Sequence, residues 1–182
     1  MILTKGMYVP ALRWRLGEYQ ALNRLTDVAK DLIVPYITIP EIEFDFELWK
    51  PKKSIQEHVE PFPDRFKTKW GQRPAWITVH PEILGKPMDS GQDIFTYIFE
   101  NLRAYETNAV PALPLDAPLA VIPVVRDIIA INQLGVAITV RMEDLMKPDA
   151  RLRVETLCSK LGISLEETDL VIDLGSPNFE PY

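Results

Sequence analysis

The sequence has very little cysteine, since Cys158 is the only one among 182 residues. A lone thiol excludes an internal disulfide and any zinc site built from several cysteines, and it suits a reducing compartment. No apolar run approaches the roughly 20 residues that a membrane-spanning helix needs. The first residues also lack the sustained apolar core of a signal peptide. These absences predict a cytoplasmic protein without membrane contact.

The short motifs of common cofactor sites are absent too. The chain contains no glycine-rich phosphate loop, no G-x-S-x-G nucleophile elbow and no dinucleotide fingerprint. A net charge of −6 argues against a general binder of polyanions. The hydrophobic content of 47% and the charged content of 25% are typical of globular proteins, so we expect residues 1–182 to form one domain.

What the sequence does contain is a series of short apolar runs that end in polar or acidic residues, most of them separated by helix-length stretches. The five runs are Leu32–Glu41, Pro74–Glu82, Ala109–Asp116, Gly135–Asp144 and Asp169–Gly175. Strands that alternate with helices indicate βαβ units and a parallel sheet. We therefore expect an α/β fold that resembles a (β/α)8 TIM barrel. With about five βα units, it would be an amino-terminal part or a partial barrel, incomplete at the carboxyl end, since complete barrels run to about 250 residues.

Local signals refine this pattern. Met7–Leu16 is expected to be a short strand or an extended lead-in, and helices are expected near Lys53–Glu60 and Asp64–Trp70. Ser90, followed three residues later by Asp93, resembles a capping box, so we expect Ser90 to cap the next helix. Three acidic residues alternate with apolar ones after the first run and would share one face of an extended chain: Glu41, Glu43 and Asp45.

In a barrel the active site lies where the strands end, and charged side chains gather at those positions. The candidate metal ligands are Glu41, Glu43 and Asp116, and the candidate catalytic residues are His80, Glu82, Arg141 and Asp173. Such a set would hold Mg²⁺ or Mn²⁺ and support metal-dependent hydrolysis of a phosphodiester. The competing interpretation is that the carboxylates cap helices or lie in solvated loops, and that Arg141 forms an internal ion pair. Whether the protein is an enzyme stays open here.

A basic segment, residues 50–73, offers a different chemistry. Its candidate nucleic-acid-binding residues are Lys50, Lys52, Lys53, Arg65, Lys67 and Lys69, and four aromatic residues are interleaved with them or adjoin them. Cations and aromatic rings can follow a nucleic-acid strand by charge and stacking. An amphipathic connector whose rings enter the core has the same composition. A protein partner is the favoured use of this segment.

Several segments resemble one protein family. They are YVPALRWRLGEYQALNRL (Tyr8–Leu25), LIVPYITIPE (Leu32–Glu41), LGVAITVRMEDL (Leu134–Leu145) and TDLVIDLGS (Thr168–Ser176). Together they resemble the Beta protein family of temperate phages, prophages and other bacterial mobile elements, with GEYQAL after the Tyr-x-Pro lead-in as the most specific part. The resemblance implies a role in phage defence or toxin control through contact with a protein partner encoded nearby. It implies no catalytic residues.

Overall fold

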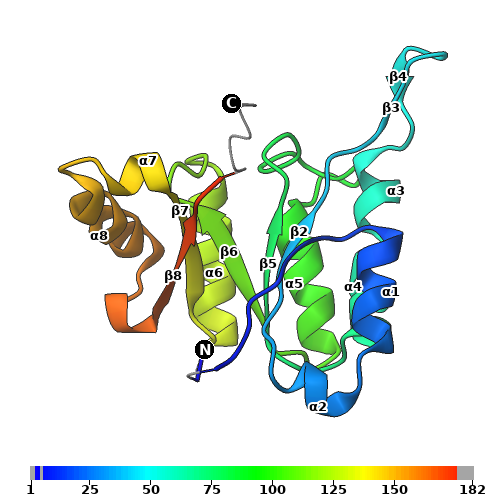
Figure 1. Ribbon diagram of the computed structural model, residues 1–182. Coiled ribbons are helices and arrows are strands. Elements are labelled where there is room, and N and C mark those ends of the chain that lie inside the picture. The colour runs from blue at the N-terminus through cyan, green and yellow to red at the C-terminus, as the bar shows by residue number, and fades with distance from the viewer. Residues whose placement is uncertain (1–2, 5, 176–182) are drawn as a thin grey trace, which may run out of the picture.

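The computed structural model describes residues 3–4 and 6–175, and its centre is a curled sheet of six parallel strands (Figure 1). The strands are β1 (Ala11–Arg13), β2 (Tyr36–Ile39), β5 (Ala75–Val79), β6 (Ala109–Pro114), β7 (Val136–Arg141) and β8 (Thr168–Asp173). They lie in the sheet in chain order, β1-β2-β5-β6-β7-β8. The sheet and its helices therefore form a half-barrel, which bears out the expected α/β fold and partial barrel at this level.

Helices surround the sheet, and the longer ones cover its outer, convex side (Figure 1). They are α1 (Leu16–Arg24), α2 (Asp27–Lys30), α3 (Ile55–Val59), α4 (Phe62–Lys69), α5 (Ile94–Ala104), α6 (Val121–Asn132), α7 (Met142–Leu145) and α8 (Ala150–Leu161), with a 3-10 turn η1 (Leu165–Glu167) before β8. Helix packs on neighbouring helix in the series α1, α4, α5, α6 and α8. Among the residues that the structure covers, no helix combines the length and the apolar character needed to span a membrane.

Two apolar clusters lie on the two faces of the sheet because successive side chains of a strand point to opposite sides. The larger cluster joins the convex face to the helices and includes Ile37, Ile77 and Ile138. The smaller one fills the concave face with Val34, Trp76, Val110, Ala112 and Ala137. All five residues of β5 are buried, as expected for a central strand covered on both faces.

The structure corrects three local expectations. The described residues hold six parallel strands and not five, because the short strand expected as one possibility within Met7–Leu16 does form, as β1. β2 ends at Ile39 and a separate antiparallel hairpin of β3 (Phe44–Asp45) and β4 (Lys50–Pro51) follows, so the three acidic residues of 41–45 do not share one strand.

The third correction concerns the start of α5. Its cap is Asp93, whose carboxylate accepts hydrogen bonds from the backbone N–H groups of Phe95 at 2.8 Å and Thr96 at 3.3 Å. The Ser90 hydroxyl accepts only from the N–H of Gln92, at 3.4 Å. The capping residue must stand directly before the first helical residue, and Gly91, with φ +84°, turns the chain between Ser90 and that point.

Candidate functional site

The carboxyl ends of the six strands meet at one rim of the half-barrel, at the top of Figure 1. A pocket of about 630 Å³ opens there on the concave side, and every strand of the parallel sheet contributes to its wall. Below it lies the smaller apolar cluster, and toward the rim polar and charged side chains join the apolar ones. We call this space the rim pocket.

The floor of the rim pocket carries hydroxyl groups. The Tyr36 hydroxyl lies 2.7 Å from the Thr139 hydroxyl, and Thr78 nearby is only 6% exposed. Burial raises the pKa of Tyr36 further above its ordinary value, which already lies well above neutral pH. These groups can donate or accept hydrogen bonds without carrying charge.

Charged residues stand at the edge of the rim pocket, from different strands. Arg13 comes from β1 and Arg141 from β7, while Asp116 and Asp173 follow or end β6 and β8. The structure thus brings three of the predicted residues, Asp116, Arg141 and Asp173, to one pocket. Arg141 lies 3.7 Å from Glu143, which is a loose ion pair between exposed side chains.

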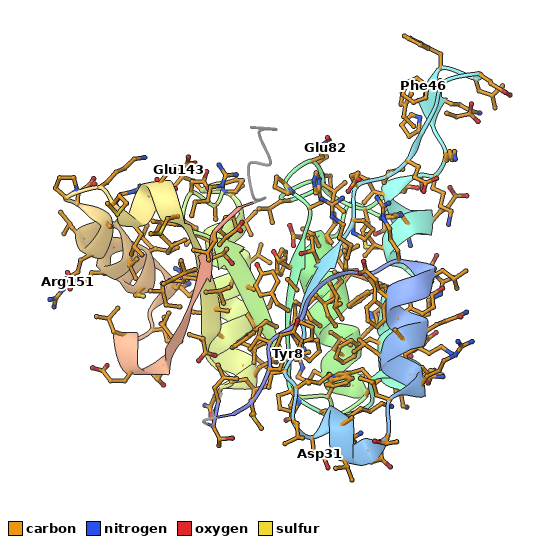
Figure 2. All side chains as sticks on the ribbon, viewed as in Figure 1. Tyr8, Asp31, Phe46, Glu82, Glu143 and Arg151 are labelled. Carbon is orange, nitrogen blue, oxygen red and sulfur yellow. The ribbon has the colours of Figure 1, made fainter. Side chains whose placement is uncertain are left out.

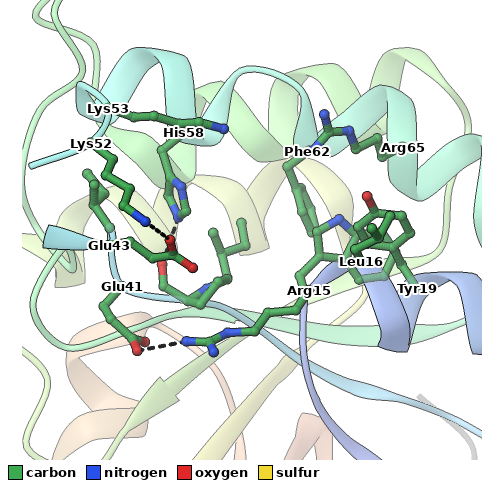
Figure 3. Close-up of a pocket in the computed structure, with 14 residues that line it drawn as sticks. Arg15, Leu16, Tyr19, Glu41, Glu43, Lys52, Lys53, His58, Phe62 and Arg65 are labelled. Carbon is green, nitrogen blue, oxygen red and sulfur yellow. Dashed lines mark hydrogen bonds and ion pairs between the residues drawn. The ribbon is translucent and has the colours of Figure 1, made fainter. Parts of the chain in front are cut away.

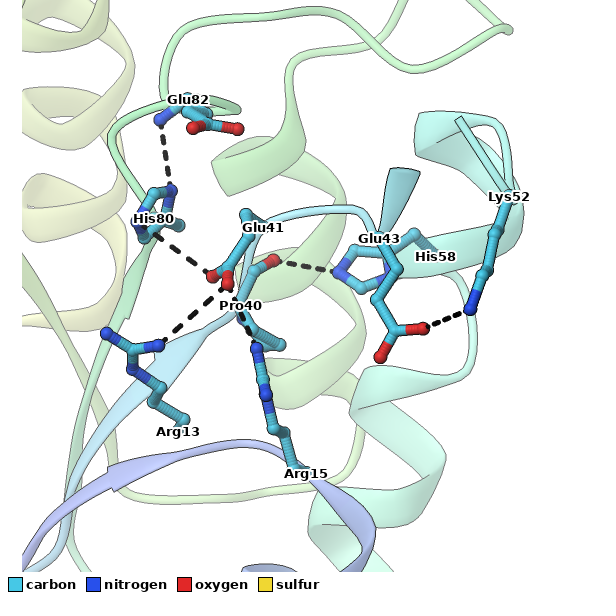
Figure 4. Close-up of polar contacts among 9 residues, drawn as sticks. All are labelled: Arg13, Arg15, Pro40, Glu41, Glu43, Lys52, His58, His80 and Glu82. Carbon is cyan, nitrogen blue, oxygen red and sulfur yellow. Dashed lines mark hydrogen bonds and ion pairs between the residues drawn. The ribbon is translucent and has the colours of Figure 1, made fainter. Parts of the chain in front are cut away.

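Beside this pocket, Glu41 is the centre of a polar cluster that joins the ends of β1, β2 and β5 (Figure 4). Its Oε1 accepts a hydrogen bond from Arg15 at 2.9 Å and lies 3.8 Å from the Arg13 guanidinium. Its Oε2 lies 3.9 Å from His80 Nε2; it is buried and has no hydrogen-bond partner among the described residues. The pKa of Glu41 is lowered, first by its own backbone N–H and then by the nearby His80, Arg15 and Arg13.

His80 is held by the turn that follows β5. Its Nδ1 accepts a hydrogen bond from the backbone N–H of Glu82 at 3.3 Å, which turns Nε2 toward Glu41. The Glu82 side chain itself is exposed and points away from the ring (Figure 4). Of the predicted catalytic residues, His80 therefore meets a predicted metal ligand, Glu41, whereas Glu82 contributes through its backbone.

Glu43 belongs to a second, smaller pocket of about 390 Å³ between β2, α1 and the segment that leads into α4 (Figure 3). Lys52 donates to its carboxylate at 2.9 Å and lowers its pKa. His58 is partly buried there, and its Nε2 donates to the Pro40 carbonyl at 2.8 Å. These contacts engage Glu43, Lys52 and His58, whereas Lys53 and Arg65 also line the pocket.

The predicted metal ligands are thus divided between different surroundings: Glu41 with arginines and a histidine, Glu43 with Lys52, and Asp116 at the edge of the rim pocket. No group of three or more histidine, cysteine or acidic side chains arranged to hold a metal occurs within residues 3–4 and 6–175. The three predicted ligands therefore do not share one site among the described residues, and metal-dependent hydrolysis stays a prediction.

The basic segment separates into two parts. Lys50, Lys52 and Lys53 lie on or just after the hairpin, whereas Arg65, Lys67 and Lys69 lie on α4. Three of its aromatic residues are core residues with at most 2% exposure, namely Phe62, Phe66 and Trp70. They cannot stack on a nucleic acid. Trp49 of the hairpin, in contrast, is 76% exposed.

Sequence reasoning did not single out Arg13, Arg15 or Tyr36. The apolar–charged–apolar alternation Leu12-Arg13-Trp14 is typical of a strand with two different faces: Leu12 and Trp14 pack on the convex cluster, and Arg13 faces the rim pocket. A strand of three residues is too short for that alternation to be convincing in sequence alone.

The fold and the rim pocket define an α/β half-barrel protein with a pocket of mixed polar and apolar lining at its strand ends. The family model described as Beta protein matches residues 8–180, and the chain belongs to this family. The resemblance expected from the sequence is thereby confirmed. No curated protein and no solved structure matches the chain.

Proposed function

We propose that this protein binds a protein partner through the β3–β4 hairpin and acts in phage defence or toxin control. The partner would be encoded nearby, and both would work in the cytoplasm. The role is an expectation for the Beta family, and the mode of action rests on one observation, the cluster of exposed aromatic side chains on the hairpin. In Figures 1 and 2 the hairpin extends beyond the body of the molecule, with Phe46 at its far end.

The hairpin presents more apolar surface than its own packing can cover. Phe46 and Trp49 are each 76% exposed, Leu48 is 65% exposed and Phe44 is 39% exposed. The three rings contact one another edge to face, with centroids 5.3 Å, 5.8 Å and 6.4 Å apart. Clustered apolar side chains at the surface mark interaction sites, and tryptophan is enriched among residues that dominate binding energy.

The charges of the hairpin favour a protein over a nucleic acid. Residues 43–53 contain three acidic residues, which alternate with or follow the two phenylalanines, and three lysines after Trp49, so the local net charge is zero. Lys52 is also engaged with Glu43 at 2.9 Å. Phosphate contacts need an excess of positive charge, whereas a protein interface needs an aromatic centre and a mixed polar rim.

The test is recovery of the partner from the host that encodes this protein. The wild-type chain should retain a defined protein encoded near its gene, and Phe46→Ala with Trp49→Ala should lose it. The matched control is Val28→Ala with Leu119→Ala, which removes side chains of similar exposure, 75% and 72%, from other surfaces. The control should bind like the wild type.

Purified partner then allows the affinity to be measured. Loss of two central aromatic anchors should weaken binding by at least a hundredfold, since each is worth about 2 kcal/mol or more. Equal retention by wild type and the hairpin variant would overturn the proposal. Recovery of nucleic acid in place of protein, with an affinity that falls steeply with salt, would favour the basic segment instead.

We also infer that the half-barrel is the beginning of a (β/α)8 barrel. Six neighbouring parallel strands in chain order match six of the eight strands of such a barrel. The outer face of β8 supports this inference, because Leu170 and Ile172 are 48% and 47% exposed where a further helix would pack. Limited proteolysis and a structure of any longer form of the chain would test it.

A further inference from the structure

We propose that the rim pocket binds a small phosphorylated and hydroxylated molecule, of the sugar phosphate or nucleotide class. Its phosphate would lie between Arg13 and Arg141, and its hydroxyls would reach the acidic and hydroxyl side chains of the wall. This site is separate from the hairpin and does not depend on the proposed protein partner.

The two arginines have hydrogen-bonding capacity to spare. Arg13 lies 3.8 Å from Glu41 and Arg141 lies 3.7 Å from Glu143, and both distances exceed a hydrogen bond. Neither guanidinium donates a side-chain hydrogen bond to any residue in the described part of the chain. Arg15, by comparison, donates to Glu41 at 2.9 Å.

The position of the arginines suits an anion of tetrahedral shape. Each is anchored at the carboxyl end of its own strand, and both line the same pocket from β1 and β7. Their side chains are 59% and 61% exposed, so they can adjust to an incoming group. A guanidinium offers parallel N–H groups that match the oxygens of phosphate, and two of them can neutralise a dianion.

The wall of the pocket selects for hydroxyl groups in addition to charge. In the register of the sheet, Thr38 of β2 lies beside Arg13 of β1 on one side and beside Thr78 of β5 on the other. Thr38 and Thr78 lie level with Arg13, and Tyr36 and Thr139 lie two residues earlier on their strands than Thr38 and Arg141; all four line the pocket. Their hydroxyls can donate to or accept from a polyhydroxylated ligand, while apolar side chains of the wall, among them Val171, supply apolar contact.

The carboxylates argue against a bare anion as the ligand. Asp116 and Asp173 line the same pocket and would repel phosphate unless the ligand also presents donors to them. Asp144, a third carboxylate at the wall, is already engaged by Lys147 at 2.8 Å and Arg153 at 2.7 Å. A ligand that carries both a phosphate and hydroxyls satisfies both kinds of group, and about 630 Å³ lies within the usual size range of small-molecule sites.

Calorimetry on the full chain with four probes tests the proposal: ribose 5-phosphate, AMP, ribose and inorganic phosphate. We expect ribose 5-phosphate or AMP to bind, and the one that binds tighter identifies the ligand class. Ribose lacks the phosphate and inorganic phosphate lacks the hydroxyls, so each should bind at least tenfold more weakly. Binding should also weaken as salt is raised.

Variants locate the site. Arg141→Gln and Arg13→Gln should each reduce affinity at least tenfold, whereas Arg151→Gln should not change it. Arg151 is the matched control because it is an exposed arginine on α8, paired with Glu155 and far from the rim in Figure 2. Circular dichroism confirms that each variant is folded.

Two results would overturn the proposal: no binding of either phosphorylated probe to the wild type, or unchanged affinity in folded Arg141→Gln. The hairpin variant, Phe46→Ala with Trp49→Ala, should bind the probes like the wild type. A failure at the rim pocket is therefore distinguishable from a failure of the protein-partner proposal.

Discussion

The hydroxyl of Tyr36 on β2 lies 2.7 Å from the hydroxyl of Thr139 on β7, although β5 and β6 separate these strands in the sheet. The hydrogen bond therefore crosses the concave face and does not follow a ladder between neighbouring strands. It connects the two halves of the curved sheet just below the rim pocket. The curvature that forms the pocket is thus fixed in part by side chains of the pocket floor.

Tyr36→Phe should lower the free energy of unfolding by about 1 kcal/mol, which is the typical net value of such a hydrogen bond. The ring stays, so the packing of the concave cluster is retained. Urea denaturation of the variant, of Thr139→Val and of the double variant measures the coupling between the two hydroxyls. Strictly additive effects would show that the bond contributes nothing to stability.

A second connection across the concave face joins β5 to β8. The indole N–H of Trp76, a residue only 2% exposed, donates to the Asp169 carboxylate at 2.9 Å. Asp169→Ala should cost about 1.5 to 3 kcal/mol, because it removes a charged acceptor and leaves a buried donor unpaired. Asp169→Asn keeps an acceptor at that place and should recover part of the loss in thermal unfolding. Equal stabilities of the two variants would contradict this account.

The regular part of the fold could be predicted from the sequence because it depends on local periodicity. Buried runs such as Ala75–Val79 and helices such as Val121–Asn132 show their period within a few residues, and the parallel order follows from the alternation of strands and helices. The helix cap was misplaced at Ser90 because two residues with capping side chains lie close together, and only the backbone decides between Ser90 and Asp93.

The site was harder to predict because it depends on where the chain goes after each strand. After Ile39 the chain places Glu41 beside Arg15 and Glu43 beside Lys52, and no short sequence pattern predicts either pair. The aromatic residues of 44–49 resemble a core segment in composition, yet Trp49 is exposed. Whether an apolar segment is exposed depends on the whole fold, so a short stretch of sequence cannot show it.

Asp144 should make stability depend on pH in the acid range. Hydrogen bonds from Lys147 and Arg153 lower its pKa from 3.8 to about 2. A lowered pKa in the folded state means that the stabilising effect is complete above about pH 4, the range of an unperturbed Asp, and is lost as the pH falls toward 2.

Asp144→Asn should therefore be less stable than the wild type at pH 6, and the difference should shrink as the pH falls from 4 toward 2. Melting temperatures of the two proteins across this range measure it. Asp149→Asn is the control, since this aspartate shows no ion pair of its own in the described residues. A difference that stays constant with pH would show that the carboxylate charge is not the cause.

Gly135 fixes the close approach of β7 to the turn that precedes β8. Its φ is +81°, and a Cβ at this position would fall inside contact distance of the Glu167 carbonyl oxygen. Gly91 has a similar φ of +84°, but nothing lies within 4 Å of the place where its Cβ would be.

Gly91→Ala should therefore cost only the strain of a left-handed alanine, about 1 to 2 kcal/mol. Gly135→Ala should cost more, by about a further 1 to 3 kcal/mol, because backbone must move to make room. Urea denaturation of both variants separates the two contributions, and equal losses would mean that the β7–β8 junction adjusts freely to the added methyl group.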